Sequence, residues 1–163
     1  MYMLAYVLLY SYATSMRAEP AVVTVPISRL TVKFALQAAQ AALAYCRAKG
    51  FEVAVTVVDR GGQPQVVLRD TLAMDLTLSI SRKKAYTAMT FGRPTSELVT
   101  NYVAKALQHE PSLLFAGGGV PIRSMGSIIG GIGVSGTSTA QMDERCALAG
   151  ATAIHLELEL RDP

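Results

Sequence analysis

The residues with the clearest chemical potential lie in a glycine-rich stretch between Leu113 and Thr137, which holds eight of the chain's thirteen glycines. Residues 131–136 spell G-x-G-x-x-G, with an apolar run before them and a helical pattern after them. Glu157 and Glu159 follow about twenty residues later, as a ribose-binding acid does in a dinucleotide fold. The motif starts too near the C-terminus for further βαβ units, and it follows a predicted hairpin. We therefore interpret it as a strand and turn of an antiparallel sheet.

A run of three glycines, Gly117, Gly118 and Gly119, is a second candidate. Consecutive backbone N–H groups in such a run can form a nest that binds an anion. A bulge or a tight crossing between strands explains the same residues equally well. Of the two glycine motifs, the triple glycine is the better candidate for a ligand-facing element.

Charged and hydroxyl side chains near the middle of the chain supply the other candidates. Arg82, Lys83 and Lys84 lie on a predicted helix, where they form a solvated face or pair with carboxylates of a ligand. Tyr86 is four residues from Arg82 and therefore its neighbour on the helix. Thr95 is most simply a helix cap, and its hydroxyl is also available to a pocket at the helix start.

Several other kinds of site have little support in the sequence. His109 and His155 are isolated, and no Cys or carboxylate stands at metal-ligand spacing, so no metal site is predicted. Ser135 and Ser138 have no histidine at a telling spacing, so a hydrolase triad is not supported. Cys46 and Cys146 are interpreted as small buried core residues, neither a disulfide framework nor a metal site.

Composition limits the class of protein. The chain has 163 residues, a net charge of +3 and 51% apolar residues, which together indicate one domain with a buried oligomer interface. No basic cluster is interleaved with aromatics, so a nucleic-acid partner is not expected. The apolar residues 1–10 are too few to span a membrane and lack the charged start of a signal peptide. We interpret residues 1–20 as an extension or the product of an upstream start and residues 21–163 as the domain. We interpret the protein as cytoplasmic, with secretion as the alternative that the short apolar N-terminus leaves open.

Hydrophobic periodicity and turn residues predict the helices and strands that would position these side chains. Helices are predicted near 31–48, 76–91, 95–108 and 138–153, and strands near 51–58, 65–69 and 128–134, with turns at 59–62 and 124–127. The alternation of residues 154–160 predicts a further strand, and residues 21–25 an optional one. The order α-β-β-α-α-β-β-β-α indicates an α+β fold with a central antiparallel five-stranded sheet covered by helices.

Six ordered blocks between Leu30 and Ala153 resemble the GlcG/HbpS-like family, which shares its domain with the C-terminal domain of PduO-type corrinoid adenosyltransferases. The blocks are VVDRGG at 57–62, SRKKAYTA at 81–88, FGRPT at 91–95, GGGVPI at 117–122, GGIGVSGT at 130–137 and DERCALAG at 143–150.

The resemblance implies an α+β fold with a five-stranded antiparallel sheet and homo-oligomers from dimers to octamers. It also implies haem as a cofactor, since some members bind it. Phe91 and Thr95 would then line the pocket, with Thr95 as an oxygen ligand, beside Arg82, Tyr86 and the triple glycine. Haem binders of this family use a histidine from the first helix, and the first predicted helix here has none.

Three functions follow as hypotheses. The first is an oligomeric protein that binds haem or another tetrapyrrole. The second is an enzyme or accessory protein acting on a small carboxylate metabolite, in which Arg82, Lys84 and the triple glycine hold the anion and Tyr86 or His109 moves a proton. The third is a ligand-free interaction module that uses the two predicted terminal strands to pair within or between subunits.

Overall fold

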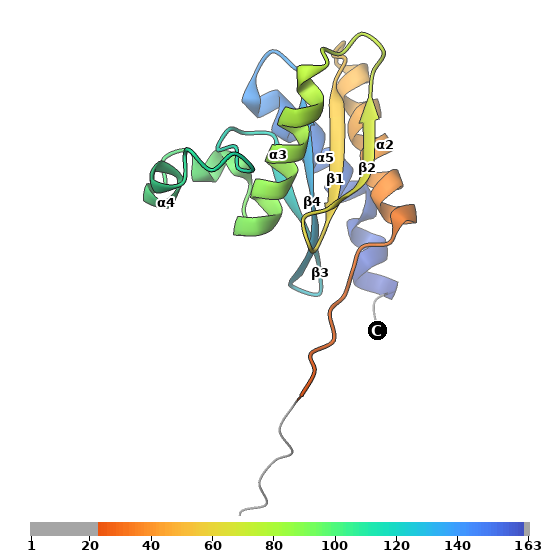
Figure 1. Cartoon of the computed structure of the whole chain (residues 1–163). Helices are drawn as coiled ribbons and strands as arrows, with labels where there is room; N and C mark the ends of the chain where they lie inside the picture. The colour runs from red at the N-terminus through yellow and green to blue at the C-terminus, as the bar shows by residue number, and fades with distance from the viewer. Residues whose placement is uncertain (1–22, 162–163) are drawn as a thin grey trace, which may run out of the picture.

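The computed structural model describes residues 23–161, which form three layers: two helices, a sheet, and a third helix on the opposite face (Figure 1). The elements are α2 (Val32–Ala48), β1 (Ala54–Asp59), β2 (Pro64–Arg69), α3 (Leu76–Phe91), the 3-10 turn η1 (Thr95–Leu98), α4 (Tyr102–Ala106), β3 (Gly119–Ser124), β4 (Ser127–Ser135) and α5 (Ala140–Arg161). Helices α2 and α5 pack together on one face, and α3 lies on the other.

All neighbouring strands are antiparallel, in the order β2-β1-β4-β3. The α+β class, the antiparallel sheet and both hairpins are confirmed. The five-stranded sheet is wrong, because the described residues form a sheet of four strands. Residues 23–25 form no strand. Residues 21–22 of that predicted strand and the predicted extension at 1–20 lie outside the described residues.

The predicted strand at 154–160 is wrong because these residues continue α5. The apolar residues that alternate in this segment also fit the spacing of a helix. Ile154 and Leu158, which are four residues apart, are both buried, and so is Gly150 one turn earlier. Leu156 and Leu160 are 68% and 74% exposed, so the leucines do not share one face. A period of two over so few residues did not distinguish the strand from the end of a helix.

The single helix predicted from Thr95 to Gln108 is replaced by η1 and the short α4. Backbone hydrogen bonds three residues apart, such as those from Val99 N to Ser96 O and from Asn101 N to Leu98 O, form the turn. Thr95 does not cap a helix. Its side chain is fully buried and accepts a hydrogen bond from another segment, as described below.

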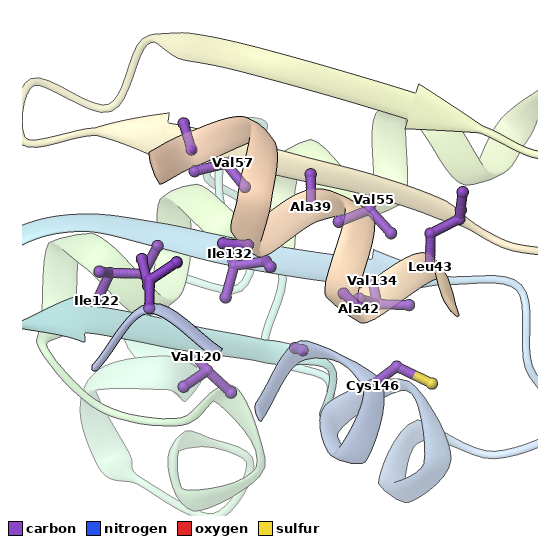
Figure 2. Close-up of a cluster of buried hydrophobic side chains, with 14 of the residues drawn as sticks. Ala39, Ala42, Leu43, Val55, Val57, Val120, Ile122, Ile132, Val134 and Cys146 are labelled. Atoms are coloured by element: carbon purple, nitrogen blue, oxygen red, sulfur yellow. The ribbon is translucent and has the colours of Figure 1, made fainter. Parts of the chain in front are cut away.

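The main core lies between the sheet and the helix pair α2 and α5 (Figure 2). Four buried alanines of α2, at positions 35, 38, 39 and 42, allow α5 to come close. A Cβ added at Gly150 would lie 2.5 Å from the carbonyl oxygen of Ala38. Val32 and Leu36 of the same helix are 63% and 40% exposed.

A disulfide joins Cys46 of α2 to Cys146 of α5, so the interpretation of two unpaired cysteines is wrong. Both residues are fully buried, and their Cα atoms are 5.6 Å apart. That separation lies within the range that a disulfide requires. The close packing of the small residues on the two helices brings together cysteines that are 100 residues apart in the chain.

Glycines of β4 explain how α3 packs on the opposite face of the sheet. Ile132 and Val134 point into the main core, and the alternate positions Gly131 and Gly133 lie under α3. A Cβ at Gly131 would be 2.5 Å from the carbonyl oxygen of Ala85, and one at Gly133 would overlap that of Ser81. The interpretation of the G-x-G-x-x-G residues as a strand in an antiparallel sheet is confirmed.

Candidate functional site

A groove of about 830 Å³ lies between α3 and the β1–β2 hairpin; we call it the α3 groove. One wall is the exposed side of α3, from Leu78 to Tyr86, and the other is the start of β2, from Gln63 to Val67. Pro111 and Ser112, which follow α4, close one side. The groove is within the size range of small-molecule sites in proteins.

The α3 groove has apolar walls and two cations. Pro64, Val67 and Leu78 supply apolar surface, and Arg82 and Lys83 supply the charges. Among residues 23–161, neither cation has an ion-pair partner. An apolar groove with uncompensated positive charge suits an amphipathic anion.

Tyr86 forms part of the same groove through a close contact with the β1–β2 turn. Gly62 has a φ of +80°, and a Cβ there would lie 2.5 Å from Cε2 of Tyr86, so the ring requires a glycine beneath it. Within the described part of the chain, the Tyr86 hydroxyl makes no hydrogen bond. It is therefore available to a ligand.

The triple glycine lies outside the α3 groove, at the junction of α3, η1 and α5. The N–H of Gly119 donates to Thr95 Oγ1 at 2.8 Å, and the N–H of Gly118 donates to Glu144 Oε2 at 3.2 Å. Gly118 has a φ of +124°, and a Cβ at Gly117 would lie 3.1 Å from the carbonyl oxygen of Ala140. These N–H groups serve contacts within the protein, and all three glycines are buried.

Lys84 forms a buried ion pair with Asp143 beside these glycines. The Nζ–Oδ2 distance is 2.6 Å, and the two side chains are 5% and 7% exposed. Lys84 Nζ also donates to the carbonyl of Val134, and Asp143 Oδ1 accepts hydrogen bonds from the N–H and hydroxyl of Thr137. The network joins α3, the end of β4 and the start of α5, so Lys84 is not available to a ligand in the α3 groove.

The predicted site residues therefore occupy separate places. Arg82 and Tyr86 lie together in the α3 groove. Thr95 and the triple glycine lie together in the buried junction. Phe91, at the end of α3, packs on Phe115 with ring centroids 5.6 Å apart.

The histidines remain at the surface. His109 is exposed near Gln108, two residues before the part of the groove wall formed by Pro111, and His155 is exposed on α5. Among residues 23–161, no three His, Cys, Asp or Glu side chains are grouped so that they could hold a metal ion. No helix within the same range is long and apolar enough to cross a membrane.

Sequence reasoning missed the apolar groove residues and the partner of Lys84. Val67 and Leu78 are exposed hydrophobic residues, which a sequence does not distinguish from buried ones. Lys84 did carry a signal: it is three residues after Ser81 and four before Ala88, on the side of α3 that packs against the sheet. A lysine on a small-residue face indicates a buried partner.

The fold and the groove define a class of small α+β domain, with helices on both faces of a four-stranded antiparallel sheet and a ligand-sized groove along one helix. The model of the family described as "Haem degrading protein HbpS-like" matches residues 30–152. The chain belongs to this HbpS-like family, as its six sequence blocks indicated.

Known relatives agree with this assignment. The crystal structure of HbpS is 36% identical, with a TM-score of 0.78 over 84% of this chain and 98% of that one. The crystal structure of a PduOC:haem complex is 27% identical, with a TM-score of 0.69 over 78% of this chain and 96% of that one. An uncharacterized 15.0 kDa protein of the dhaT-dhaS intergenic region of Citrobacter freundii is 31% identical over 71% of this chain and 85% of its own length.

Proposed function

We propose that this protein binds haem or a closely related tetrapyrrole in the α3 groove. The observation that carries the proposal is an apolar groove with two unpaired cations in a member of the HbpS-like family. The similarity to the PduOC protein, which was crystallised with haem, supports it further.

The residues present suit the chemistry of haem. Its ring is flat and apolar, and the walls formed by Pro64, Val67 and Leu78 offer apolar contact. Its two propionates are carboxylates, which Arg82 and Lys83 can pair with. Such pairing would fix the orientation of the ring by its charged edge.

Tyr86 is the side chain best placed to provide an oxygen ligand for the iron. Its hydroxyl has no partner among the described residues, and tyrosinate is a known haem ligand. Helix α2 contains no histidine. Thr95 is fully buried, and its hydroxyl already accepts the Gly119 N–H, which favours Tyr86 over Thr95. When bound, haem would supply a redox-active iron.

Titration with haemin tests the proposal. We expect a saturable Soret band for the wild-type protein. In the Arg82→Ala/Lys83→Ala variant, affinity should fall roughly tenfold or more, because hydrogen bonds to charged groups contribute about 1.5–3 kcal/mol. Tyr86→Phe should alter the position of the Soret band. Arg145→Ala changes an exposed cation on α5 away from the groove and serves as the control.

The result that would refute the proposal is the absence of a saturable Soret band in the wild-type protein. Equal binding by the wild-type protein and by both groove variants would place haem elsewhere. The absorption spectrum and mass spectrum of protein purified from cells would identify any tetrapyrrole that it already carries.

The small-carboxylate hypothesis is less well supported by the geometry. Arg82 and Tyr86 still share one groove, but Lys84 and the triple glycine are committed to the buried junction. The ligand-free module loses its main support, because residues 154–160 are helical.

We also propose that the protein works as a homo-oligomer. Between β2 and the start of α3, Leu72, Met74 and Leu76 are 79%, 64% and 55% exposed, and exposed apolar residues that gather on a surface are typical of interfaces. Light scattering of the purified protein should give a multiple of the chain mass. A monomer at micromolar concentration would contradict this.

A further inference from the structure

A second pocket, separate from the α3 groove, is rich in arginine. It has a volume of about 590 Å³ and lies at the end of the sheet where the segment before α2, the β1–β2 turn and the β3–β4 turn meet. Arg29, Arg60 and Arg123 come from these three segments, and we call the site the arginine pocket. Figure 1 shows the segment before α2 descending beside the β3–β4 hairpin.

The charges around the arginine pocket are not balanced. Among the described residues that line it, none is acidic, and Ser28 and Ser127 add hydroxyl groups. Guanidinium groups that share one cleft repel one another, and the cleft concentrates a positive potential. An anion bound between them would relieve this repulsion.

The carboxylate that pairs with an arginine of the pocket is Asp59, at the start of the β1–β2 turn, and it is largely committed to that turn. Its Oδ1 accepts hydrogen bonds from the N–H groups of Gly61 and Gln63, at 2.8 and 2.9 Å. Its Oδ2 lies 3.8 Å from a guanidinium nitrogen of Arg29, too far for a hydrogen bond. Asp59 therefore compensates at most one of the three positive charges.

The other two arginines have no carboxylate partner among residues 23–161. Arg123 is held by two backbone carbonyls: its Nη2 donates to Gly92 O at 2.7 Å and its Nη1 to Gly126 O at 3.2 Å. These bonds fix its position without neutralising it. Within the described part of the chain, the Arg60 guanidinium makes one polar contact, from Nη1 to the sulfur of Met89 at 3.8 Å, so its planar fork is available to a carboxylate or phosphate.

We propose that the arginine pocket binds a small metabolite with a dianionic head group, either a phosphate monoester or a dicarboxylate. Three guanidinium groups from three segments suit the several oxygens of such a group, and arginine pairs with carboxylate and phosphate through two parallel hydrogen bonds. Ile27 and Ile128, which also line the pocket, would contact the carbon skeleton of the metabolite. The site is independent of haem binding in the α3 groove.

Calorimetric titration of the full chain with inorganic phosphate and with succinate tests the proposal, with sodium chloride held at matched ionic strength. We expect saturable binding of at least one probe. Binding of phosphate alone identifies a phosphate monoester as the ligand class, and binding of succinate alone identifies a dicarboxylate. The absence of saturable binding above the chloride control overturns the proposal.

Substitutions locate the binding. Arg60→Gln should lower the affinity for the probe roughly tenfold or more, since it removes charge-assisted hydrogen bonds. Arg60→Lys, which keeps the charge, should lower the affinity less. Arg145→Gln, on the exposed surface of α5, should bind as the wild type does. Equal affinity in Arg60→Gln and the wild type overturns the proposed site.

Haemin titration of the same variants separates this proposal from the proposed function. Arg60→Gln should bind haemin as the wild type does, which also shows that the variant is folded. A tenfold loss of haemin affinity in Arg60→Gln would overturn the independence of the two sites. Phosphate or succinate binding in a protein that does not bind haemin would leave the arginine pocket supported and refute only the haem proposal.

Discussion

The disulfide between Cys46 and Cys146 should be a major source of stability. The two cysteines are 100 residues apart, so the bond closes most of the domain into one loop. In the chain-entropy model, a closed loop of this length stabilises the folded state by about 4.7 kcal/mol, because the unfolded chain has less freedom to lose. The reduced cysteines would remain small apolar residues in a buried position, so little packing should be lost.

Urea unfolding of oxidised and reduced protein measures this contribution. Both sulfurs are buried, so the protein should be reduced while unfolded and then refolded with the reductant present. With a urea m-value of about 2 kcal/mol/M, the reduced form should unfold at a midpoint lower by roughly 2 M.

The Cys46→Ala/Cys146→Ala variant is the control, because its midpoint should not respond to reductant. Alkylation of wild-type protein that is unfolded without reductant should modify neither cysteine. A difference of less than about 1 kcal/mol between the two forms would refute the loop-closure reasoning.

Two further predictions concern buried contacts of α3 and are tested by the same urea assay. Lys84→Met should lower the free energy of unfolding by about 3–5 kcal/mol, because it leaves the carboxylate of Asp143 buried without its partner. Adding Asp143→Leu to that variant should restore part of the loss, and a further loss of similar size would contradict this account. Gly133→Ala should cost about 1–3 kcal/mol or more, because its Cβ would overlap the carbonyl oxygen of Ser81. Gly61→Ala, in an exposed turn, should change the free energy of unfolding by about 0.5 kcal/mol or less. Equal losses of stability in Gly133→Ala and Gly61→Ala would refute the packing argument.

Local signals in the sequence predicted those parts of the fold that depend on neighbouring residues. The turn of Asp59 to Gly62, the helix ending at Gly92 and the hairpin turn at Met125–Gly126 all follow from glycines with positive φ at chain reversals. The end of α5 could not be predicted in the same way. Its leucines fit periods of both two and four, and only the packing of Ile154 and Leu158 on the rest of the domain decides between them.

The candidate site was predicted only in part, for a related reason. Arg82 and Tyr86 lie one helical turn apart, so a sequence can place them together. The pairing of Lys84 with Asp143 and that of Cys46 with Cys146 join residues 59 and 100 positions apart. No local pattern encodes such a contact, because it depends on how closely whole helices approach the sheet and one another.

The glycines of β4 also bear on how this protein can change over evolutionary time. Because α3 rests on bare strand backbone at Gly131 and Gly133, few substitutions on its inner side are tolerated, and its distance from the sheet is fixed. The outer side of the same helix, which carries Leu78, Arg82 and Lys83, has no such restriction. The ligand preference that we propose for the α3 groove can therefore change through replacement of outer residues alone, while the helix that presents them stays in place.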